Sequence, residues 1–547
     1  MKTRRIAWIA GLAVAAVAMT GCSASSGGDS EGGAAQEGGT LTYLEPQTWN
    51  TLYPPAAGFY PNGGIVNQVT DRLLYQNPET LELEPWIAEE LPEVNADATE
   101  YTFKLREGVT YSDGTPLDAE NVVKNFDLFG KGDTDRALSV SEAINNYDHG
   151  EVVDEHTVKF VFSAPSPGFA QATSTINSGL LSNSTLDRTN EEFGPGNATE
   201  IIGSGPFVIS DEQIGKETDL EVRKDYDWAP ESRVHQGRAH LDAIDVIVAG
   251  ESSVRVGTVT SGQAQIARQI PAPDEAQFTG DKLQLVQAAT NGVNNSLSFR
   301  FDHAPLDDIK VRQAIIAGVD RQAIVDTLFT DSYPLATGIL AKTALGYEDT
   351  SDFYEYDPDR AKQLLDEAGW KPGSDGIREK DGERLSITFN EALPQPRSKD
   401  VVTLIQEQLA GLGIEVKLFP GDQAAQDEAR LDADTIQVYH SMVGRADFDV
   451  LKSQFFSTNR NALLNLDTES GEIADPELDE ALAKVASVPT ADERAKASAA
   501  AQQILAEKAY VLPLFEEPQV FGLLSSVQGF ATESIGRPSF YDVQLGK

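Results

Sequence analysis

Residues 101–129 read YTFKLREGVTYSDGTPLDAENVVKNFDLF, and this stretch predicts a strand, a turn and a capped helix. Its first six residues alternate between apolar and polar, which is typical of a strand with one buried face. The segment SDGTP then supplies turn chemistry, because Gly tolerates positive φ and Pro cannot extend a strand ladder. Asp118 can cap a helix that begins at Ala119, and apolar residues at helical spacing follow. The chain therefore reverses between a half-buried strand and an amphipathic helix.

This stretch resembles the signature of the extracytoplasmic solute-binding proteins of family 5, the peptide and nickel receptors of ATP-driven importers. Three later segments resemble motifs of the same family, at 305–321, 356–370 and 510–515. The resemblance runs from Leu41 to Phe530. It implies an α/β, two-lobed periplasmic-binding-protein-like fold of type II, in the large family-5 form with an extra subdomain in the first lobe. The ligand would lie between the lobes, which a hinge of two chain crossings joins.

The length of 547 residues favours two or three subdomains. From the resemblance we expect lobe I over residues 40–290, with the inserted subdomain at about 60–200. Lobe II is expected over 291–510, and residues 511–547 are expected to return to lobe I.

Residue patterns also predict individual elements within the lobes. Apolar spacing predicts a helix over 65–74, and alternation predicts a strand over 435–439. The chain is expected to be helical from Pro476 to Ala506. Asp320 and Asp357 are placed to cap two further helices.

The N-terminal residues predict a secretion signal. Three basic residues precede an apolar run over 6–19, which is short for a membrane span. The run ends in MTGC, which resembles a bacterial lipobox, and Cys22 is the only cysteine of the chain. We therefore expect a lipoprotein signal peptide over 1–21 and a lipid anchor on Cys22. The alternative is a free cysteine after an ordinary cleaved signal. Residues 22–39 are almost all small or polar, which is typical of a flexible tether.

The net charge of −43 limits the partners of the chain. Such a field repels nucleic acid and anionic lipid, so we expect no nucleic-acid partner. The charge is explained either by a solvated acidic surface or by a preference for cationic ligands. One cysteine cannot form an internal disulfide or a multi-thiolate metal site, and the six histidines show no metal-ligand spacing. We therefore expect no cofactor and no protein-bound metal.

Enzyme motifs are missing from the sequence. The pattern G-x-S-x-G occurs only as GDSEG at 28–32, inside the expected tether, so it is not an elbow between a strand and a helix. An H-E-x-x-H pair, paired cysteines and a P-loop do not occur. A non-enzyme is expected. Two other classes stay open: a secreted hydrolase that assembles distant residues, and a chaperone-like binder of unfolded segments.

Two segments of the first lobe are expected to face the cleft. The loop over 46–64 is rich in rigid aromatic residues, and its equivalent in the family walls the ligand cleft, which makes Tyr60 a candidate ligand-binding residue. Alternatively, these aromatics pack on their own lobe. Segment 169–182 is expected to be a helix and loop that face the cleft, with Asn177 as its candidate.

The second lobe is expected to contribute the residues that follow the predicted strand over 435–439. The candidates are His440, Met442, Arg445 and Asp447. In many dipeptide receptors of the family this strand end reads Trp-x-Gly-Asp, and the Asp pairs with the peptide amino terminus. Here the acids come slightly later, so Asp447 matches that role imperfectly.

Three arginines are candidates for a functional or a structural role. Arg460 lies about where nickel receptors place a histidine, and a guanidinium there favours a carboxylate-bearing ligand over a bare metal. The alternative is a surface loop residue. Arg312 and Arg321 are expected to hold helix ends and carbonyl groups rather than to perform chemistry.

The resemblance implies a substrate-binding lipoprotein of an ABC importer. Its ligand class is expected to be short peptides, which it would pass to the permease subunits in the membrane. The alternative ligand is a chelated metal, such as a nickel or metallophore complex, or another small amino-acid-derived solute. We expect a monomer in the extracytoplasmic or periplasmic space, anchored to the bacterial cell membrane.

Overall fold

β1 (Thr40–Glu45) lies inside a seven-stranded sheet, where it runs parallel to both of its neighbours. The computed structural model describes residues 37–393, 395–432, 434–457, 463–464 and 475–546. The expected signal peptide, Cys22 and Arg460 lie outside the described residues. The strand order of this sheet is β12-β21-β11-β1-β10-β9-β8. Its other strands are β8 (Phe207–Gln213), β9 (Glu217–Val222), β10 (Ala243–Val248), β11 (Ile266–Arg268), β12 (Leu283–Ala288) and β21 (Gln519–Leu524).

A second sheet has five strands in the order β18-β17-β19-β13-β20. They are β13 (Val293–Phe299), β17 (Ser386–Phe389), β18 (Glu415–Leu418), β19 (Val438–Val443) and β20 (Val511–Phe515). Every residue of β13 and of β20 is buried, so both strands lie inside the core. β19 extends to Val443, beyond the strand expected over 435–439, because its pairing with β13 continues there.

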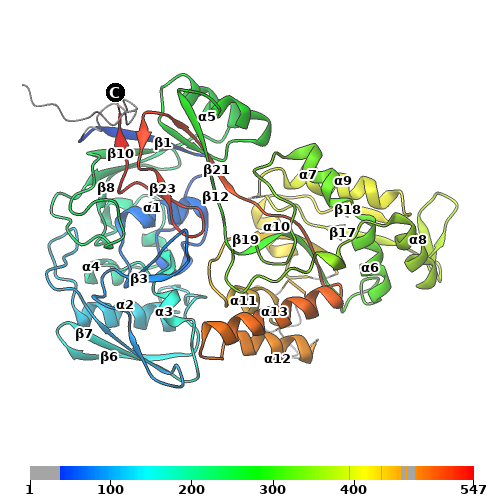
Figure 1. The fold of residues 1–547 in the computed structure, drawn as a ribbon, viewed down its shortest axis with the longest axis horizontal. Coiled ribbons are helices and arrows are strands. Elements are labelled where there is room, and N and C mark those ends of the chain that lie inside the picture. Colours follow the sequence, from blue (N-terminus) through cyan, green and yellow to red (C-terminus); the bar gives the residue numbers. More distant parts are fainter. Residues whose placement is uncertain (1–36, 394, 433, 458–462, 465–474, 547) are drawn as a thin grey trace, which may run out of the picture. The chain divides into compact units, whose positions relative to one another are not determined.

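The chain passes between these two sheets twice, at 289–292 and at 516–518. β12 and β21, which adjoin the crossings, pair side by side in Figure 1. A return to lobe I was expected at residue 511. In the structure β20 pairs with β13, Ser298 facing Val511, so the chain leaves the second sheet only after Phe515. If each lobe is defined by its sheet, the return to lobe I begins after Phe515, several residues later than expected.

The signature stretch forms part of a separate four-stranded sheet in the order β4-β5-β7-β6. Its strands are β4 (Glu93–Val94), β5 (Glu100–Lys104), β6 (Tyr147–Asp154) and β7 (Thr157–Phe162). The helix α2 (Ala119–Lys131) begins as predicted, with the Asp118 carboxylate accepting from the backbone N–H of Asn121 at 2.9 Å. The rings of Phe126 and Phe160 lie 4.7 Å apart and tie the helix to the sheet.

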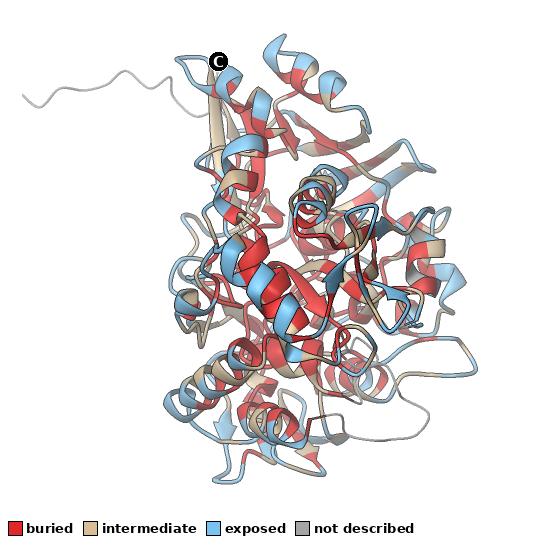
Figure 2. Cartoon of the chain, turned by 90° about the vertical axis from the view of Figure 1, so that its right-hand side faces the viewer, coloured by how far each residue is buried: buried red, intermediate tan, exposed pale blue. Residues whose placement is uncertain are grey.

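Helices surround the five-stranded sheet, and α6 to α9 gather beside β17 and β18 (Figure 1). They are α6 (Ile309–Gly318), α7 (Arg321–Leu328), α8 (Pro358–Glu367) and α9 (Ser398–Ala410). The carboxylates of Asp320 and Asp357 accept from the N–H groups of Ala323 and Arg360, which confirms both predicted caps. In Figure 2 the helices that face the viewer are exposed along one side and buried along the other.

Arg312 and Arg321 hold backbone carbonyl groups, as predicted. Arg312 donates to Lys508 O at 2.8 Å and to Leu306 O at 2.5 Å. Arg321 donates to Ala336 O and to Pro513 O, both at 2.9 Å. These contacts join helix ends to β20 and its flanking residues.

Two predicted helices have different bounds in the structure. The helix expected over 65–74 is α1 (Tyr60–Val69), which starts earlier because Pro61 fits the first turn, where its missing N–H is not needed. It ends at Thr70, whose backbone is extended. The helical stretch expected over 476–506 is divided into α12 (Pro476–Val485) and α13 (Ala491–Glu507), and the Thr490 hydroxyl caps the second.

The remaining elements are short. The helices are α3 (Phe169–Ala172), α4 (Asn183–Leu186), α5 (Ser252–Thr260), α10 (Gln423–Ala429) and α11 (Val450–Phe455). The strands are β2 (Leu74–Gln76), β3 (Leu83–Pro85), β14 (Lys371–Pro372), β15 (Arg378–Lys380), β16 (Glu383–Arg384), β22 (Val527–Gln528), β23 (Ala531–Thr532), β24 (Pro538–Ser539) and β25 (Gln544–Leu545).

Candidate ligand-binding site

A cavity of about 680 Å³ lies where β11 of the first sheet, β19 of the second sheet and the second crossing meet. The start of α1, residues 175–177, residues 390–393 and 395, and the segment 533–537 also contribute to its wall. A volume of this size lies within the range of cavities that enclose a small ligand. Because both sheets contribute, a ligand in the cavity would contact both at once.

Most of the residues proposed from sequence lie at this cavity. Tyr60, Asn177, His440, Met442 and Arg445 line it. Asp447 is absent from the lining but binds Arg445. A role of these residues in ligand binding stays a prediction.

Tyr60 is held firmly in the cavity wall. Its hydroxyl donates to Ile535 O at 2.5 Å. The guanidinium carbons of Arg268 and Arg537 lie 5.3 Å and 4.9 Å from its ring centroid, which are cation–π distances. Burial raises the pKa of Tyr60 well above its ordinary value, so the phenol stays neutral. The ring therefore offers a rigid, neutral surface.

Asn177 and Met442 are placed differently from each other. The Asn177 amide donates to the carbonyl groups of Pro54 and Pro55 at 3.0 Å and 3.1 Å. The side-chain nitrogen of Asn177 therefore holds the aromatic loop in place. A ligand that accepts a hydrogen bond from Asn177 would compete for this same nitrogen. Met442 lies near the end of β19 and is partly exposed. Its thioether can adapt to ligands of different shape.

His440 is fully buried, and neighbours occupy both of its ring nitrogens. Nε2 lies 2.5 Å from Asn295 Oδ1, and Nδ1 lies 2.9 Å from Ser398 Oγ. The amide nitrogen of Asn295 donates to Glu517 Oε2 at 2.8 Å, so its oxygen is the acceptor and His440 Nε2 carries the proton. Burial lowers the pKa of His440 to about 4, which keeps the ring neutral. The geometry favours a positioning role over direct ligand contact.

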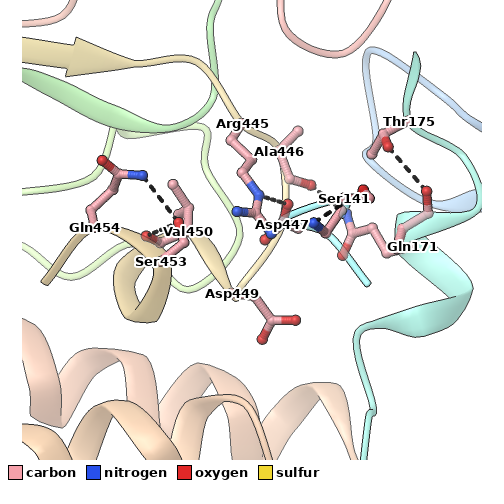
Figure 3. A network of polar contacts seen from close by, with 12 residues as sticks. Ser141, Gln171, Thr175, Arg445, Ala446, Asp447, Asp449, Val450, Ser453 and Gln454 are labelled. Atoms are coloured by element: carbon pink, nitrogen blue, oxygen red, sulfur yellow. Dashed lines mark hydrogen bonds and ion pairs between the residues drawn. The ribbon is translucent and has the colours of Figure 1, made fainter. Parts of the chain in front are cut away.

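Arg445 points toward Asp447, and its Nε donates to Asp447 Oδ2 at 2.5 Å (Figure 3). Burial alone would lower the pKa of Arg445, but the negative charges of Asp447, Asp449 and Glu142 raise it above its ordinary value. Among the described residues, no acceptor binds the two terminal nitrogens of Arg445. This guanidinium can therefore donate to a ligand carboxylate.

The segment 446–449 contacts both halves of the chain. The Ala446 carbonyl accepts from the side-chain amides of Gln76, at 3.0 Å, and of Gln171 (Figure 3). The Asp449 carboxylate pairs with Arg494. The Ala446 contacts place the segment after β19 against β2 and α3, and the Asp449 pair joins it to α13.

The structure does not favour Asp447 as the partner of a peptide amino group. Its Oδ2 is held by Arg445, and its Oδ1 is buried without a hydrogen-bond partner among the described residues. It does not line the cavity. A ligand amine therefore needs another carboxylate.

Arg268 and Glu45 form a buried ion pair that was missed from the sequence. The Arg268 Nε lies 3.1 Å and 3.0 Å from the two Glu45 oxygens, and its Nη2 also contacts Glu45. Its Nη1 donates to Gln519 Oε1 at 2.8 Å. Burial alone would lower the pKa of Arg268, but Glu45 raises it, so the charge persists. The two residues lie on separate strands of one sheet, which no local pattern reveals.

Glu517 is the second missed residue. It lies on the second crossing, lines the cavity and is only 4% exposed. Burial raises the pKa of its carboxyl to about 7, although Asn295 and Arg268 oppose the shift. The acidic pair Glu516-Glu517 directly after the strand VLPLF was the signal that could have identified it.

Across the part of the chain that the structure describes, no three side chains of His, Cys, Asp or Glu are grouped to hold a metal ion. None of the described helices combines the length and the apolar character needed to cross a bilayer.

Comparison with known sequences gives a family match. The model of the bacterial extracellular solute-binding proteins, family 5 (middle region), matches residues 82–461. The glutathione-binding protein GsiB of Escherichia coli O1:K1 / APEC is 25% identical over 499 residues, which cover 89% of this chain and 91% of that protein.

Solved structures have the same fold. DppA from Helicobacter pylori, in complex with the peptide STSA, gives a TM-score of 0.77 at 21% identity, covering 94% of this chain and 99% of that chain. NikZ from Campylobacter jejuni, in complex with Ni(L-His), gives 0.75 at 20% identity, covering 92% of this chain and 97% of that chain. These likenesses confirm the α/β, two-lobed fold expected from sequence.

Proposed function

Because the chain belongs to the bacterial extracellular solute-binding proteins of family 5, which serve ABC importers, we propose that it captures short peptides outside the cytoplasm and delivers them to a permease. Members of this family bind solutes and are not enzymes. The choice of short peptides as the class of ligand is our proposal.

The cavity carries the proposal. Its volume of about 680 Å³ suits a short peptide, and its wall mixes apolar surface with charges of both signs. The charged residues of the wall are Glu142, Arg268, Glu391, Arg430, Arg445, Glu517, Glu533 and Arg537. A solute with an ammonium group and a carboxylate, as a peptide has, would complement such a wall. The names of GsiB and of the DppA complex support this class of ligand.

Three further features belong to the proposal. We place the protein on the outer face of the bacterial cell membrane, held by a lipid on Cys22. We infer that it acts as a monomer. Its direct partners are the ligand and the membrane subunits of the importer.

A metal bound to an organic chelator is the second candidate ligand. The NikZ complex with Ni(L-His) favours it, because that ligand contains an amino acid. Such a chelate would bring its own amine and carboxylate groups into a wall of mixed charge.

Native mass spectrometry of protein purified without refolding tests the proposal. We expect a co-purified peptide that is released unaltered on denaturation. A metal-containing adduct would favour the second candidate. Cleavage of added peptides by the protein would contradict a binding function.

A further inference from the structure

Glu517 is a buried carboxylate at the ligand cavity that forms no ion pair with a cation among the described residues. We propose that Glu517 binds a cationic group of the ligand, which in a peptide is the terminal ammonium. The inference rests on the proposed function, because it assumes that the solute occupies this cavity. Glu517 is then the residue that selects for a positive charge on the solute.

Two cations of the cavity wall, Arg268 and Arg537, are already engaged. Arg268 binds Glu45 and Gln519 with all three of its nitrogens. Arg537 binds Glu533 and the Gly58 carbonyl. Neither forms an ion pair with Glu517. The charge of Glu517 is therefore left for something that enters the cavity.

A directional chain of hydrogen bonds orients the Glu517 carboxylate. The Ala392 N–H donates to Ser398 Oγ at 2.8 Å, and the Ser398 hydroxyl donates to His440 Nδ1. His440 Nε2–H donates to Asn295, whose amide donates to Glu517 Oε2. Each member donates to the next, so the chain ends in an oxygen that must accept. Among the described residues no donor reaches the other oxygen, Oε1.

Burial makes this arrangement costly without a ligand. A carboxylate removed from water and left with one hydrogen bond is destabilised, and an opposite charge compensates for it. The raised pKa of Glu517, about 7, expresses the same cost. A ligand ammonium beside Oε1 would relieve it, and a neutral group would not.

Glu517 also joins the two chain crossings. It lies on the crossing 516–518, and its backbone carbonyl accepts from Thr290 Oγ1, on the first crossing, at 3.0 Å. A cation held by Glu517 is therefore attached to both of the segments that join the two sheets.

Isothermal titration calorimetry with matched ligands tests the inference. The probes are di- and tripeptides of alanine with a free amino terminus, the same peptides N-acetylated, and the diamine putrescine. We expect the wild-type protein to prefer free amines by at least about tenfold. The Glu517→Gln variant, which retains an acceptor for Asn295, should lose this preference and bind the acetylated peptides as the wild type does.

The matched control is Glu516→Gln, which changes the neighbouring acid outside this cavity and should leave the preference intact. A thermal melt of unliganded Glu517→Gln at pH 7.5 should give a higher Tm than that of the wild type, whereas loss of a structural residue would lower it. The inference is overturned if the wild type binds no amine-bearing probe, if it binds amine and acetylated probes equally, or if Glu517→Gln keeps the preference. Binding of putrescine without any peptide would support the inference and contradict the peptide proposal.

Discussion

The side-chain amide of Asn295 donates to the carboxylate of Glu517 at 2.8 Å, and both side chains are buried. Asn295 lies on β13, between β19 and β20 in the second sheet, and Glu517 lies on the crossing that leaves this sheet. This bond is the last of a series that begins at the Ala392 backbone. It fixes a negative charge at the cavity wall, and several measurable consequences follow from it.

The unliganded protein should lose stability as pH rises through neutrality. Folding raises the pKa of Glu517 from 4.5 to about 7, so the folded state binds more protons than the unfolded state between these values. Protonated Glu517 makes its full contribution to the free energy of unfolding below pH 4.5. Ionisation of Glu517 removes about 3 kcal/mol of this free energy as the pH rises to about 7. Urea unfolding at several pH values should show this slope in the wild type and not in Glu517→Gln.

Comparison of these two proteins removes the contributions of other acids, such as buried Asp71, whose pKa is raised to about 6. Arg268, Tyr60 and Tyr333 interact electrostatically with Glu517, and none of them changes charge in this range. Equal slopes in both proteins would contradict the assignment.

Affinity for an amine-bearing ligand should change with pH in the opposite direction. An ammonium favours the ionised carboxylate, so affinity should rise between about pH 5.5 and pH 7.5, while peptide amino groups remain protonated. Titrations of a free-amine peptide at four pH values give the measurement. A constant affinity in this range would count against direct contact with Glu517.

Removal of the Glu45 charge should strongly destabilise the fold. The Glu45→Gln change leaves the guanidinium of Arg268 buried without its counter-charge, which costs about 3–5 kcal/mol in comparable buried pairs. Chemical denaturation measures the loss. Lys104→Gln, which removes one member of the exposed pair with Glu90, is the control and should leave the midpoint almost unchanged. Similar losses in both variants would show that burial is not the cause.

Arg445 should contribute to recognition of a ligand carboxylate. Replacement by Gln removes the two terminal nitrogens that have no partner among the described residues. We expect affinity for peptides with a free carboxyl terminus to fall by about tenfold or more, and affinity for their C-terminal amides to stay the same. Arg384→Gln, at an exposed arginine, is the control. A uniform loss for both ligand forms would indicate damage to the fold instead.

Gly292 should tolerate no side chain, because a Cβ there would lie 1.9 Å from Val443 O and 2.7 Å from Arg445 N. Gly292→Ala would displace the end of β19, so both ligand affinity and the free energy of unfolding should fall. Gly257→Ala, in α5, meets nothing within 4 Å and is the control. It should be neutral or slightly stabilising. Normal ligand affinity in Gly292→Ala would show that the strand end adapts.

The parts of the fold that follow from local chemistry were predictable from sequence. Asp118, Asp320 and Asp357 cap the helices expected of them, because a cap depends on a few neighbouring residues. The start of α1 was missed, because proline and aromatic residues at 54–61 indicate a loop, and only the fold shows that Pro61 opens a helix.

The charged centre of the site could not be found in this way. Glu517 acquires its role from Asn295, which is 222 positions away in the chain. The pair of Arg268 and Glu45 joins residues separated by 223 positions. His440, proposed from sequence as a ligand-binding residue, lines the cavity, but sequence could not show that both of its ring nitrogens are occupied. These roles depend on burial and on contacts between segments that lie far apart in the sequence. A local sequence pattern reveals neither.

The most direct test of a protein that captures a solute and releases it unaltered is a titration with a short-peptide library, followed by mass spectrometry of the released ligand. We expect one peptide bound per chain, recovered at its original mass. Recovery of cleaved peptides, or no bound solute from either a peptide or a metal-chelate library, would contradict the account.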